Sequence, residues 1–515
     1  MVDNIDKALD LGGKPELEIL KKETEVVIDG QRVPAPEGLE IEIDEEGGAM
    51  VDFDPREALP EIEFYSNLAE VLDEQDLGAL ADELMEDFEN DKSSRKDWEE
   101  AYIKGLDLLG LKYKERTNPF RGASSATHPL LAESATQFQA TAFKELLPSG
   151  GPVRTIIMGN ETPEKYARAG RVQEFMNFQL MNKMEDFTPE YDQMLFYLPL
   201  AGSTFKKVYY DELMERPVSK FIPAEDLVVN YMATDLDGCE RICQVINMSY
   251  NDFRKKQVSG FYKDIDITPS QYTSDEVQKK YDQIEGTKPS YADKVVKLYE
   301  FHVSLDLKDF EDKDETGEMT GIKIPYIVTV EEGSSQVVGI RRNFEKDDPK
   351  KMKKQYFVHY KFLPGLGFYG FGLIHMIGGL SRTATDILRQ LLDAGTLSNL
   401  PAGFKSRGIR MRDDAEPLQP GEFRDIDAPN GDLRNSFMPL PYKEPSQTLY
   451  SLLGFVVQAG QRFASIADMQ VGDANQNAPV GTTIALLERG SRIMSAIHKR
   501  CYYSQKKEFK LLYQV

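Results

Sequence analysis

The 515-residue chain has few of the residues that cross-linked proteins and metalloproteins depend on. Its only cysteines are Cys239, Cys243 and Cys501, and it has five histidines. So few cysteines in so long a chain argue against a disulfide framework and fit a reducing cytoplasm. Cys239 and Cys243 are four positions apart, but no further ligand of suitable type is near them in the sequence. Because structural zinc needs four such ligands, we expect no metal site.

Catalytic signatures are also missing. The sequence contains no Walker-type phosphate loop, no Gly-x-Ser-x-Gly turn and no His-Glu-x-x-His motif. The histidines are scattered singly, and acidic pairs such as Asp82-Glu83 and Glu86-Asp87 have the spacing of solvated helix faces. We therefore predict no catalytic residue, no cofactor and no enzymatic activity.

Long apolar runs are scarce. The first twenty residues lack the apolar core of a signal peptide. Residues 362–381 form one uncharged window as long as a membrane span, but six glycines and a proline interrupt it. We interpret this window as a buried strand-to-helix junction and expect no membrane contact.

The net charge of −24 is not spread over the chain. Residues 1–100 hold 32 of the 86 acidic residues and 9 of the 62 basic ones, which leaves 54 acidic against 53 basic residues in the rest. The sequence thus predicts a nearly neutral body behind an acidic N-terminal region. A neutral body does not exclude contact with a phosphate backbone, as uniform acidity would.

The first 372 residues divide into an arm and a body. Residues 1–65 are acidic and poor in periodicity, which indicates an extended arm or partner-binding tail, or else a solvated terminus. Residues 66–372 predict an α+β body, with helices first, including a long one over 163–194, and a serine-capped break at 91–94. Strand-like runs follow at 204–210, 227–230, 295–305, 324–332, 336–342 and 356–362, with surface helices at 249–257 and 274–285.

A literal Gly-x-Gly-x-x-Gly motif lies at Gly365, Gly367 and Gly370. It follows a strand-like run and precedes a helix, which is the context of a dinucleotide-binding turn. Against that interpretation, bulky Phe368 and Tyr369 crowd the place where a pyrophosphate must approach, and no second parallel strand follows. We favour a tight turn into a packed helix.

The last third of the chain has a distinctive serial order. Residues 373–397 carry an apolar stripe at helical spacing, and a second helix, expected from Pro445, repeats it at Leu449, Leu452, Val456, Phe463 and Ile466. Between them, residues 398–444 show short alternating runs typical of a small β-rich insert. A polar loop over 469–480 leads into a third, basic helix over 481–515.

Three sets of residues in this region are candidates for contact with DNA or an acidic partner. On the third helix a set of cations lies roughly on one side, suited to phosphate contact or, alternatively, to a solvated face or inter-subunit salt bridges. In the insert, two pairs of cations suit an acidic partner or DNA, with an ordinary charged edge strand as the alternative. The loop amides can touch a phosphate backbone without gripping it, or serve as a connector. These candidates are Arg489, Arg492, Lys499 and Arg500; Lys405, Arg407, Arg410 and Arg412; and Gln470, Asn475, Gln476 and Asn477.

This serial order, together with three strings, resembles the portal proteins (head-to-tail connectors) of short-tailed bacteriophages. The strings are HPLLAESA at 128–135, FYGFGL at 368–373 and LRQLLDAGTLSN at 388–399. The resemblance implies a wing over 66–372, stem helices over 373–397 and 445–468, a clip over 398–444, a tunnel loop over 469–480 and a tunnel helix over 481–515. A C-terminal crown, usual in such proteins, is expected to be short or missing from this sequence.

The same resemblance implies a dodecameric ring at one vertex of the capsid, assembled in the host cytoplasm and retained in the virion. Double-stranded DNA would pass through it without sequence-specific contact. The wing would contact the major capsid protein, and the clip would dock the terminase large subunit and later the tail adaptor, with Arg407, Arg410 and Arg412 as its contacts. The alternatives are another virion structural or adaptor protein, and an enzyme that binds a nucleotide cofactor at residues 365–372.

Overall fold

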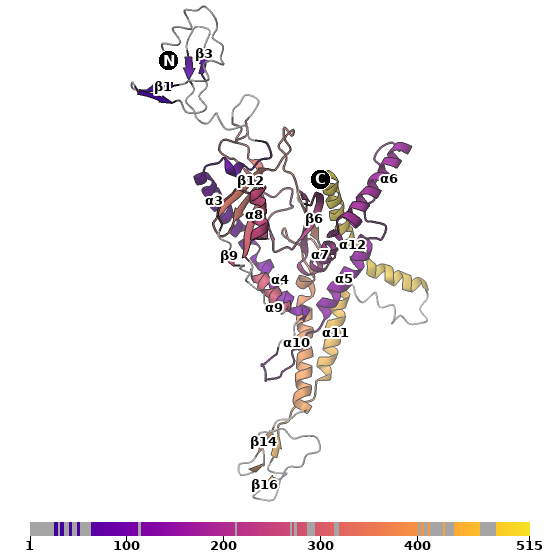
Figure 1. Cartoon of the computed structure of the whole chain (residues 1–515). Coiled ribbons are helices and arrows are strands. Elements are labelled where there is room, and N and C mark those ends of the chain that lie inside the picture. The colour runs from indigo at the N-terminus through magenta and orange to yellow at the C-terminus, as the bar shows by residue number, and fades with distance from the viewer. Residues whose placement is uncertain are drawn as a thin grey trace, which may run out of the picture. The chain divides into compact units, whose positions relative to one another are not determined.

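The computed structural model (Figure 1) describes residues 63–111, 115–211, 214–267, 275–285, 294–313, 319–399, 437–463 and 480–515, together with short strands elsewhere. The chain separates into two compact units, Met1–Ser66 and Asn67–Val515. In the first unit, two small antiparallel hairpins are described, within a segment whose sequence predicts no strands. They pair β1 (Glu25–Ile28) with β2 (Gln31–Pro34) and β3 (Ile41–Ile43) with β4 (Ala49–Val51).

The second unit combines helices with antiparallel sheets, so the α+β prediction is confirmed. Its larger sheet has the strand order β12-β11-β10-β8-β7, and the short β9 pairs with β10. The strands are β7 (Leu227–Val228), β8 (Arg241–Ser249), β9 (Ser270–Gln271), β10 (Lys294–Leu305), β11 (Ile324–Glu331) and β12 (Gln336–Arg342).

A three-stranded sheet has the order β13-β5-β6. Its strands are β5 (Ser203–Asp211), β6 (Arg216–Ile222) and β13 (Phe357–Lys361). Sequence patterns predict β5 and β13 but not β6, which contains Pro217, nor β8 of the larger sheet, in which Gln244 and Asn247 interrupt the apolar run. Both missed strands are set by pairing with neighbours distant in the sequence.

The helices follow the predicted order with shifted boundaries. The described helices before residue 290 are η1 (Leu68–Glu70), α3 (Glu74–Ser94), α4 (Lys96–Leu106), η2 (Asp107–Leu109), α5 (Leu130–Leu146), α6 (Pro163–Phe178), η3 (Gln179–Lys183), α7 (Phe187–Ala201), α8 (Tyr250–Val258) and α9 (Glu276–Glu285).

Two helix predictions are wrong in detail. The break between α3 and α4 falls at Arg95, and Ser94 bonds back to the carbonyl of Asp91 instead of capping α4. The long helix expected over 163–194 is interrupted by the π-helical turn η3, after which α7 begins at Phe187.

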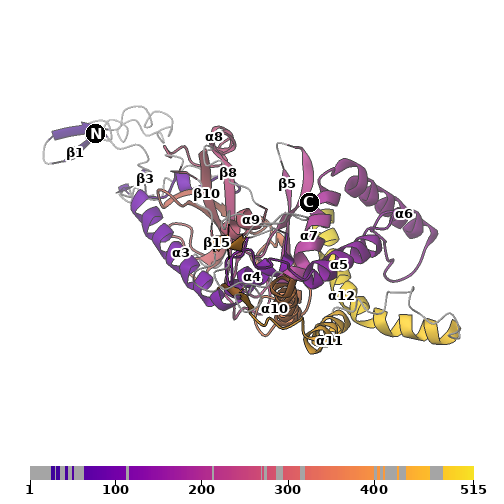
Figure 2. The same ribbon diagram turned by 90° about the horizontal axis from the view of Figure 1, so that it is seen from below.

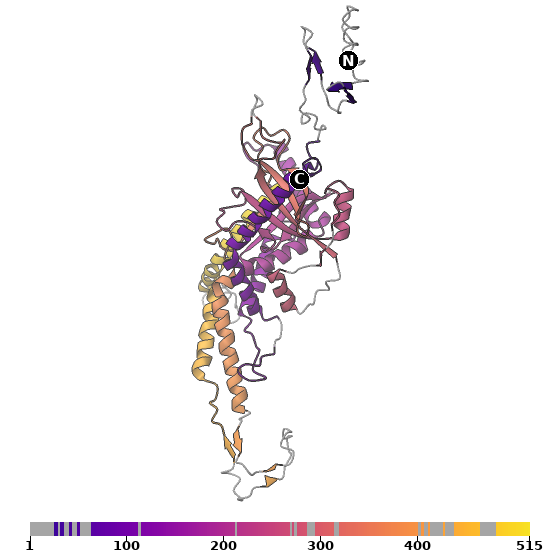
Figure 3. The same cartoon turned by 90° about the vertical axis from the view of Figure 1, so that its left-hand side faces the viewer.

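Three helices make up the distinctive last third: α10 (Leu373–Asn399), α11 (Gln447–Phe463) and α12 (Val480–Gln514). Figures 1 and 3 show α10 and α11 side by side, with the small strands of the insert near their far ends. Of the second expected helix, the part after Phe463, including Ile466, lies outside the described residues, and its start is at Gln447, two residues after Pro445.

The main hydrophobic core joins α4, α5, α7, α10 and α12 to the three-stranded sheet. Phe138, Tyr191, Phe205 and Ile377 are fully buried in it. A second, smaller core lies between α8 and the larger sheet around Phe253 and Leu298. Because α10 contributes Leu373, Ile374 and Ile377 to the main core, its first turns are fixed to the body.

Candidate functional site

The start of α10 is locked to the body by close packing and by hydrogen bonds. A Cβ added to Gly105 of α4 would lie 2.0 Å from Cγ2 of Ile374, so these two helices touch where only glycine fits. Further along, Arg389 Nε donates to the carbonyl of Ala126 at 2.8 Å, and the amide of Ser124 donates to Asp393 Oδ1 at 2.6 Å. Helix α4 therefore contacts the start of α10, and the loop before α5 holds it further along, at Arg389 and Asp393.

The paired helices α10 and α11 share a narrow apolar seam. Its buried members are Ala384, Ile387 and Val456, flanked by Leu380, Leu391, Leu449, Leu453 and Val457. Leu452, expected in this seam, is 44% exposed, and Leu453 takes its place. The seam explains the helical stripes of the sequence.

The pair also exposes several large apolar side chains. Tyr450 is 64% exposed and Phe455 is 69% exposed on α11, and Leu392 on α10 is 45% exposed. Large exposed apolar side chains on neighbouring elements are typical of a surface that another protein covers. The described part of the chain supplies no cover for them.

The insert between the helices contains two separate two-stranded sheets. One pairs β14 (Gly403–Lys405) with β17 (Phe437–Pro439), and the other pairs β15 (Arg410–Met411) with β16 (Ile426–Asp427). Lys405 and Arg410 therefore lie in different sheets. Arg407 and Arg412 lie outside the described residues, so the docking role of these four cations stays a prediction.

Helix α12 is anchored by a polar cluster beneath the three-stranded sheet. Glu508 is fully buried and accepts hydrogen bonds from Ser219 Oγ of β6, at 2.5 Å, and from the hydroxyl of Tyr360 of β13. Lys206 of the central strand is also fully buried, with its ammonium group 5.1 Å from the ring centroid of Phe187. Burial lowers the pKa of Lys206, and the Glu508 carboxylate opposes that shift. One acidic side chain thus joins α12 to both edges of the sheet.

The four cations predicted on α12 have different surroundings. Arg500 is half-buried and donates from Nη1 to the carbonyl of Phe362 at 2.6 Å, so its guanidinium holds the end of β13. This bond gives Arg500 a structural role, and its contact with DNA stays a prediction. Lys499 is exposed. The side chains of Arg489 and Arg492, and the whole loop with Gln470, Asn475, Gln476 and Asn477, lie outside the described residues, and their roles stay predictions.

The glycine-rich turn before α10 is packed against the protein's own backbone. A Cβ on Gly370 would lie 2.5 Å from the carbonyl oxygens of Gly202 and Leu363. The amide of Gly370 donates to Ser203 Oγ at 2.7 Å, and the amide of Phe368 donates to the carbonyl of Tyr231 at 2.8 Å. These amides are already occupied, which argues against a pyrophosphate at this turn.

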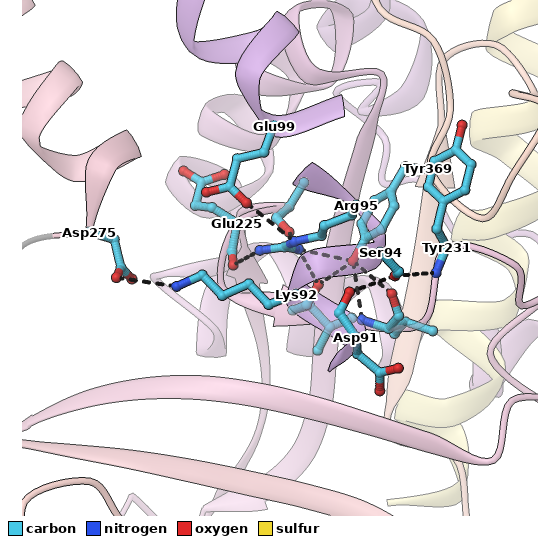
Figure 4. A network of polar contacts seen from close by, with 12 residues as sticks. Asp91, Lys92, Ser94, Arg95, Glu99, Glu225, Tyr231, Asp275 and Tyr369 are labelled. Atoms are coloured by element: carbon cyan, nitrogen blue, oxygen red, sulfur yellow. Dashed lines mark hydrogen bonds and ion pairs between the residues drawn. The ribbon is translucent and has the colours of Figure 1, made fainter. Parts of the chain in front are cut away.

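Arg95, at the break between α3 and α4, organises a buried polar network (Figure 4). Its guanidinium donates to the carbonyls of Ala224, Glu225 and Leu227 at 2.6 to 3.0 Å and to the hydroxyl of Tyr369 at 2.9 Å. Arg95 is 2% exposed, so this network ties the loop between β6 and β7 to the glycine-rich turn. Sequence reasoning missed it because a lone arginine gives no sign of burial.

A cavity of about 340 Å³ lies next to Arg95. Burial raises the pKa of Asp226 to about 7, and the carboxylates of Glu225 and Asp275 add to the shift. Burial also raises the pKa of Glu225, whose Oε1 accepts a hydrogen bond from Tyr281 at 2.7 Å. Perturbed carboxylates in a cleft can mark an active site, but this lining has no histidine, cysteine, serine or threonine. Sequence reasoning missed this pair as well, because adjacent acidic residues are usually solvated.

Nowhere among the described residues do three or more His, Cys, Asp or Glu side chains come together in a way that could hold a metal ion. None of the described helices has both the length and the apolar character to cross a membrane. In comparisons with known proteins, no family model matches the chain and no curated protein matches it significantly.

Proposed function

We propose that this chain is the subunit of a bacteriophage portal, a dodecameric ring at one capsid vertex through which double-stranded DNA is packaged and later ejected. The observation that carries the proposal is the helical pair α10 and α11 with the β insert between them. One helix of the pair is locked into the body, and the pair exposes large apolar side chains. Such a surface needs a neighbour, and neighbouring copies in a ring supply one.

In this proposal the chain acts as a passive conduit. Residues 66–372 are the wing that contacts the major capsid protein, and residues 398–444 are the clip that docks the terminase large subunit and then the tail adaptor. A separate terminase hydrolyses ATP. Lys499 and, in our prediction, Arg489 and Arg492 contact the DNA backbone without reading its sequence, because phosphate contacts carry no sequence information.

The rival assignments have less support. An enzyme with a nucleotide at residues 365–372 needs free amides and open space, and the packing of Gly370 against Gly202 and Leu363 leaves neither there. Another virion structural or adaptor protein would form rings or shells as well, but it has no need of the paired helices.

Negative-stain electron microscopy of the purified chain tests the proposal. We expect rings of about a dozen subunits with a central hole, since head-to-tail contacts close into a ring when the rotation between copies allows it. A compact dimer or tetramer would overturn the proposal and direct attention to the cavity beside Arg95.

A further inference from the structure

Helix α6 has one face that the rest of the described chain covers only thinly. The segment that covers this face includes Val153 and Thr155. The amide of Val153 donates to Asn177 Oδ1 at 2.9 Å, and Thr155 Oγ1 donates to the carbonyl of Ala169 at 3.1 Å. Ala169 and Asn177 lie on the same side of a helix with 3.6 residues per turn. No side chain of α6 itself is buried.

The opposite face of α6 combines cations with aromatic rings. Arg168, Arg171, Phe175 and Phe178 follow one another at spacings of three and four, so they form one stripe. Both arginines are exposed, Phe175 is 62% exposed and Phe178 is 48% exposed. Within the described residues, no carboxylate forms an ion pair with either arginine. Arginine and aromatic residues together are the composition of interface centres.

Helix α3 carries a stripe of the opposite charge. Asp82, Glu86 and Glu89 are spaced at i, i+4 and i+7, and all three are exposed. The one lysine of α3, Lys92, pairs instead with Asp275, its Nζ lying 3.7 Å from Oδ1 of that residue. Like charges at this spacing repel one another and weaken a helix. A cationic surface placed over them would remove that repulsion.

Helices α3 and α6, which carry the two stripes, lie on opposite sides of the second unit (Figures 1 and 2). Figures 1 and 2 both show α3 and α6 apart, with the larger sheet, α7 and the three-stranded sheet between them. A surface on one side that matches a different surface on the other side is the arrangement of a head-to-tail contact, which generates a ring. One chain cannot bring its own stripes together, but two neighbouring copies can.

We propose that the Arg168/Arg171/Phe175/Phe178 face of α6 docks on the Asp82/Glu86/Glu89 stripe of α3 in a second copy of this chain. The inference rests on the proposed function, because it identifies which surfaces join adjacent subunits of the ring. Charge complementarity selects the second copy as the occupant and sets the direction in which copies follow one another.

Charge exchange in the full-length chain tests this pairing. Arg168→Glu/Arg171→Glu should lower the fraction of chains in rings about tenfold or more at physiological salt, because like charges then meet across the contact. Asp82→Arg/Glu86→Arg should have the same effect. Equal amounts of the two variants, mixed, should form rings again, because alternating copies then meet through either the native or the exchanged charge pairing, and both are attractive. The matched control is Lys323→Glu/Lys346→Glu. It makes the same charge change at two exposed lysines outside α6 and should leave the rings intact.

A cross-link adds a readout that does not depend on assembly yield. Arg168→Cys and Glu86→Cys, introduced into the same chain, should form a disulfide between copies that is visible as a ladder on a non-reducing gel. Each single cysteine variant should give no ladder. The native cysteines are buried or half-buried, which keeps the background low.

The outcomes separate this inference from the proposed function. Rings that form normally from Arg168→Glu/Arg171→Glu, without the cross-linked ladder, would overturn the α6–α3 contact and leave the portal proposal standing. If those rings fail only to join the capsid shell, the α6 face belongs to the shell protein and the inference is wrong. A wild-type chain that forms a compact dimer would overturn both.

Discussion

The buried carboxylate of Glu508 gives the sharpest test of how the last helix is held. Glu508→Ala would leave the hydroxyls of Ser219 and Tyr360 without their acceptor and would remove the only carboxylate that bonds to both edge strands among the described residues. Lys206, fully buried on the strand between them, would lose a compensating charge. Breaking such a buried charged group typically lowers the free energy of unfolding by about 3–5 kcal/mol. This is a large part of the roughly 5–15 kcal/mol that stabilises a domain.

Urea unfolding of the dissociated chain measures this effect. Trp98 is the only tryptophan of the chain and is 6% exposed, so its fluorescence reports the body directly. Lys506→Gln is the control, because Lys506 is exposed on the same helix and should change the free energy by no more than about 0.5 kcal/mol. If Glu508→Ala also falls within about 1 kcal/mol of the wild type, α12 does not depend on this cluster and the reasoning is wrong.

A double-mutant cycle separates the charge from the hydrogen bonds. Lys206→Met removes the buried cation, so Glu508→Gln should be less costly in that background than in the wild type, by about 0.5–3 kcal/mol. Equal costs in the two backgrounds would show that Lys206 and Glu508 are not coupled.

Four further predictions follow from the geometry and from the proposal. Gly370→Ala should lower the free energy of unfolding by about 1–3 kcal/mol or more, measured by urea unfolding, because its Cβ meets two carbonyl oxygens; a neutral result would contradict the close packing. Asp226→Asn should stabilise the protein at pH 8 more than at pH 5. Because the pKa of Asp226 is raised in the folded chain, the wild type loses stability as the pH rises from about 4 through 7. If the urea midpoints of Asp226→Asn and the wild type differ by the same amount at both pH values, this reasoning is refuted. Arg410→Glu/Arg412→Glu should leave rings intact in the electron microscope while weakening terminase binding, and normal packaging would count against the clip assignment. Deleting residues 475–477 should spare the ring but reduce packaged DNA per particle, and an unchanged phage yield would exclude a role for the loop.

The helices of the last third could be predicted from sequence because their signal is local. Apolar residues recur at helical spacing in α10, and the structure confirms a helix over Leu373–Asn399. The strands β6 and β8 could not be found this way. Pro217 and Lys220 in β6, and Gln244 in β8, are poor strand signals alone, and pairing with β5 and β10 decides their conformation.

The candidate residues were harder to judge, because exposure depends on tertiary contacts. Arg500 and Lys499 are adjacent in sequence and chemically similar, yet one binds the carbonyl of Phe362 and the other is exposed. In a count of charges along α12, Glu508 only lowers the positive total. Its buried role cannot be read from the sequence, because its partner Ser219 is 289 positions away. Spacing along a helix shows which residues share a face and does not show what that face contacts.

The anchoring of α12 has a consequence for the time course of biosynthesis. Tyr360 of β13 is synthesised 148 residues before its hydrogen-bond partner Glu508 of α12. At about 5–20 residues per second, the nascent chain waits roughly 7–30 s with the three-stranded sheet uncovered and Lys206 lacking its counter-charge. The three-stranded sheet therefore cannot be completed before α12 has been synthesised. In the proposed ring, copies would therefore join only after each finished chain has closed its own sheet with α12.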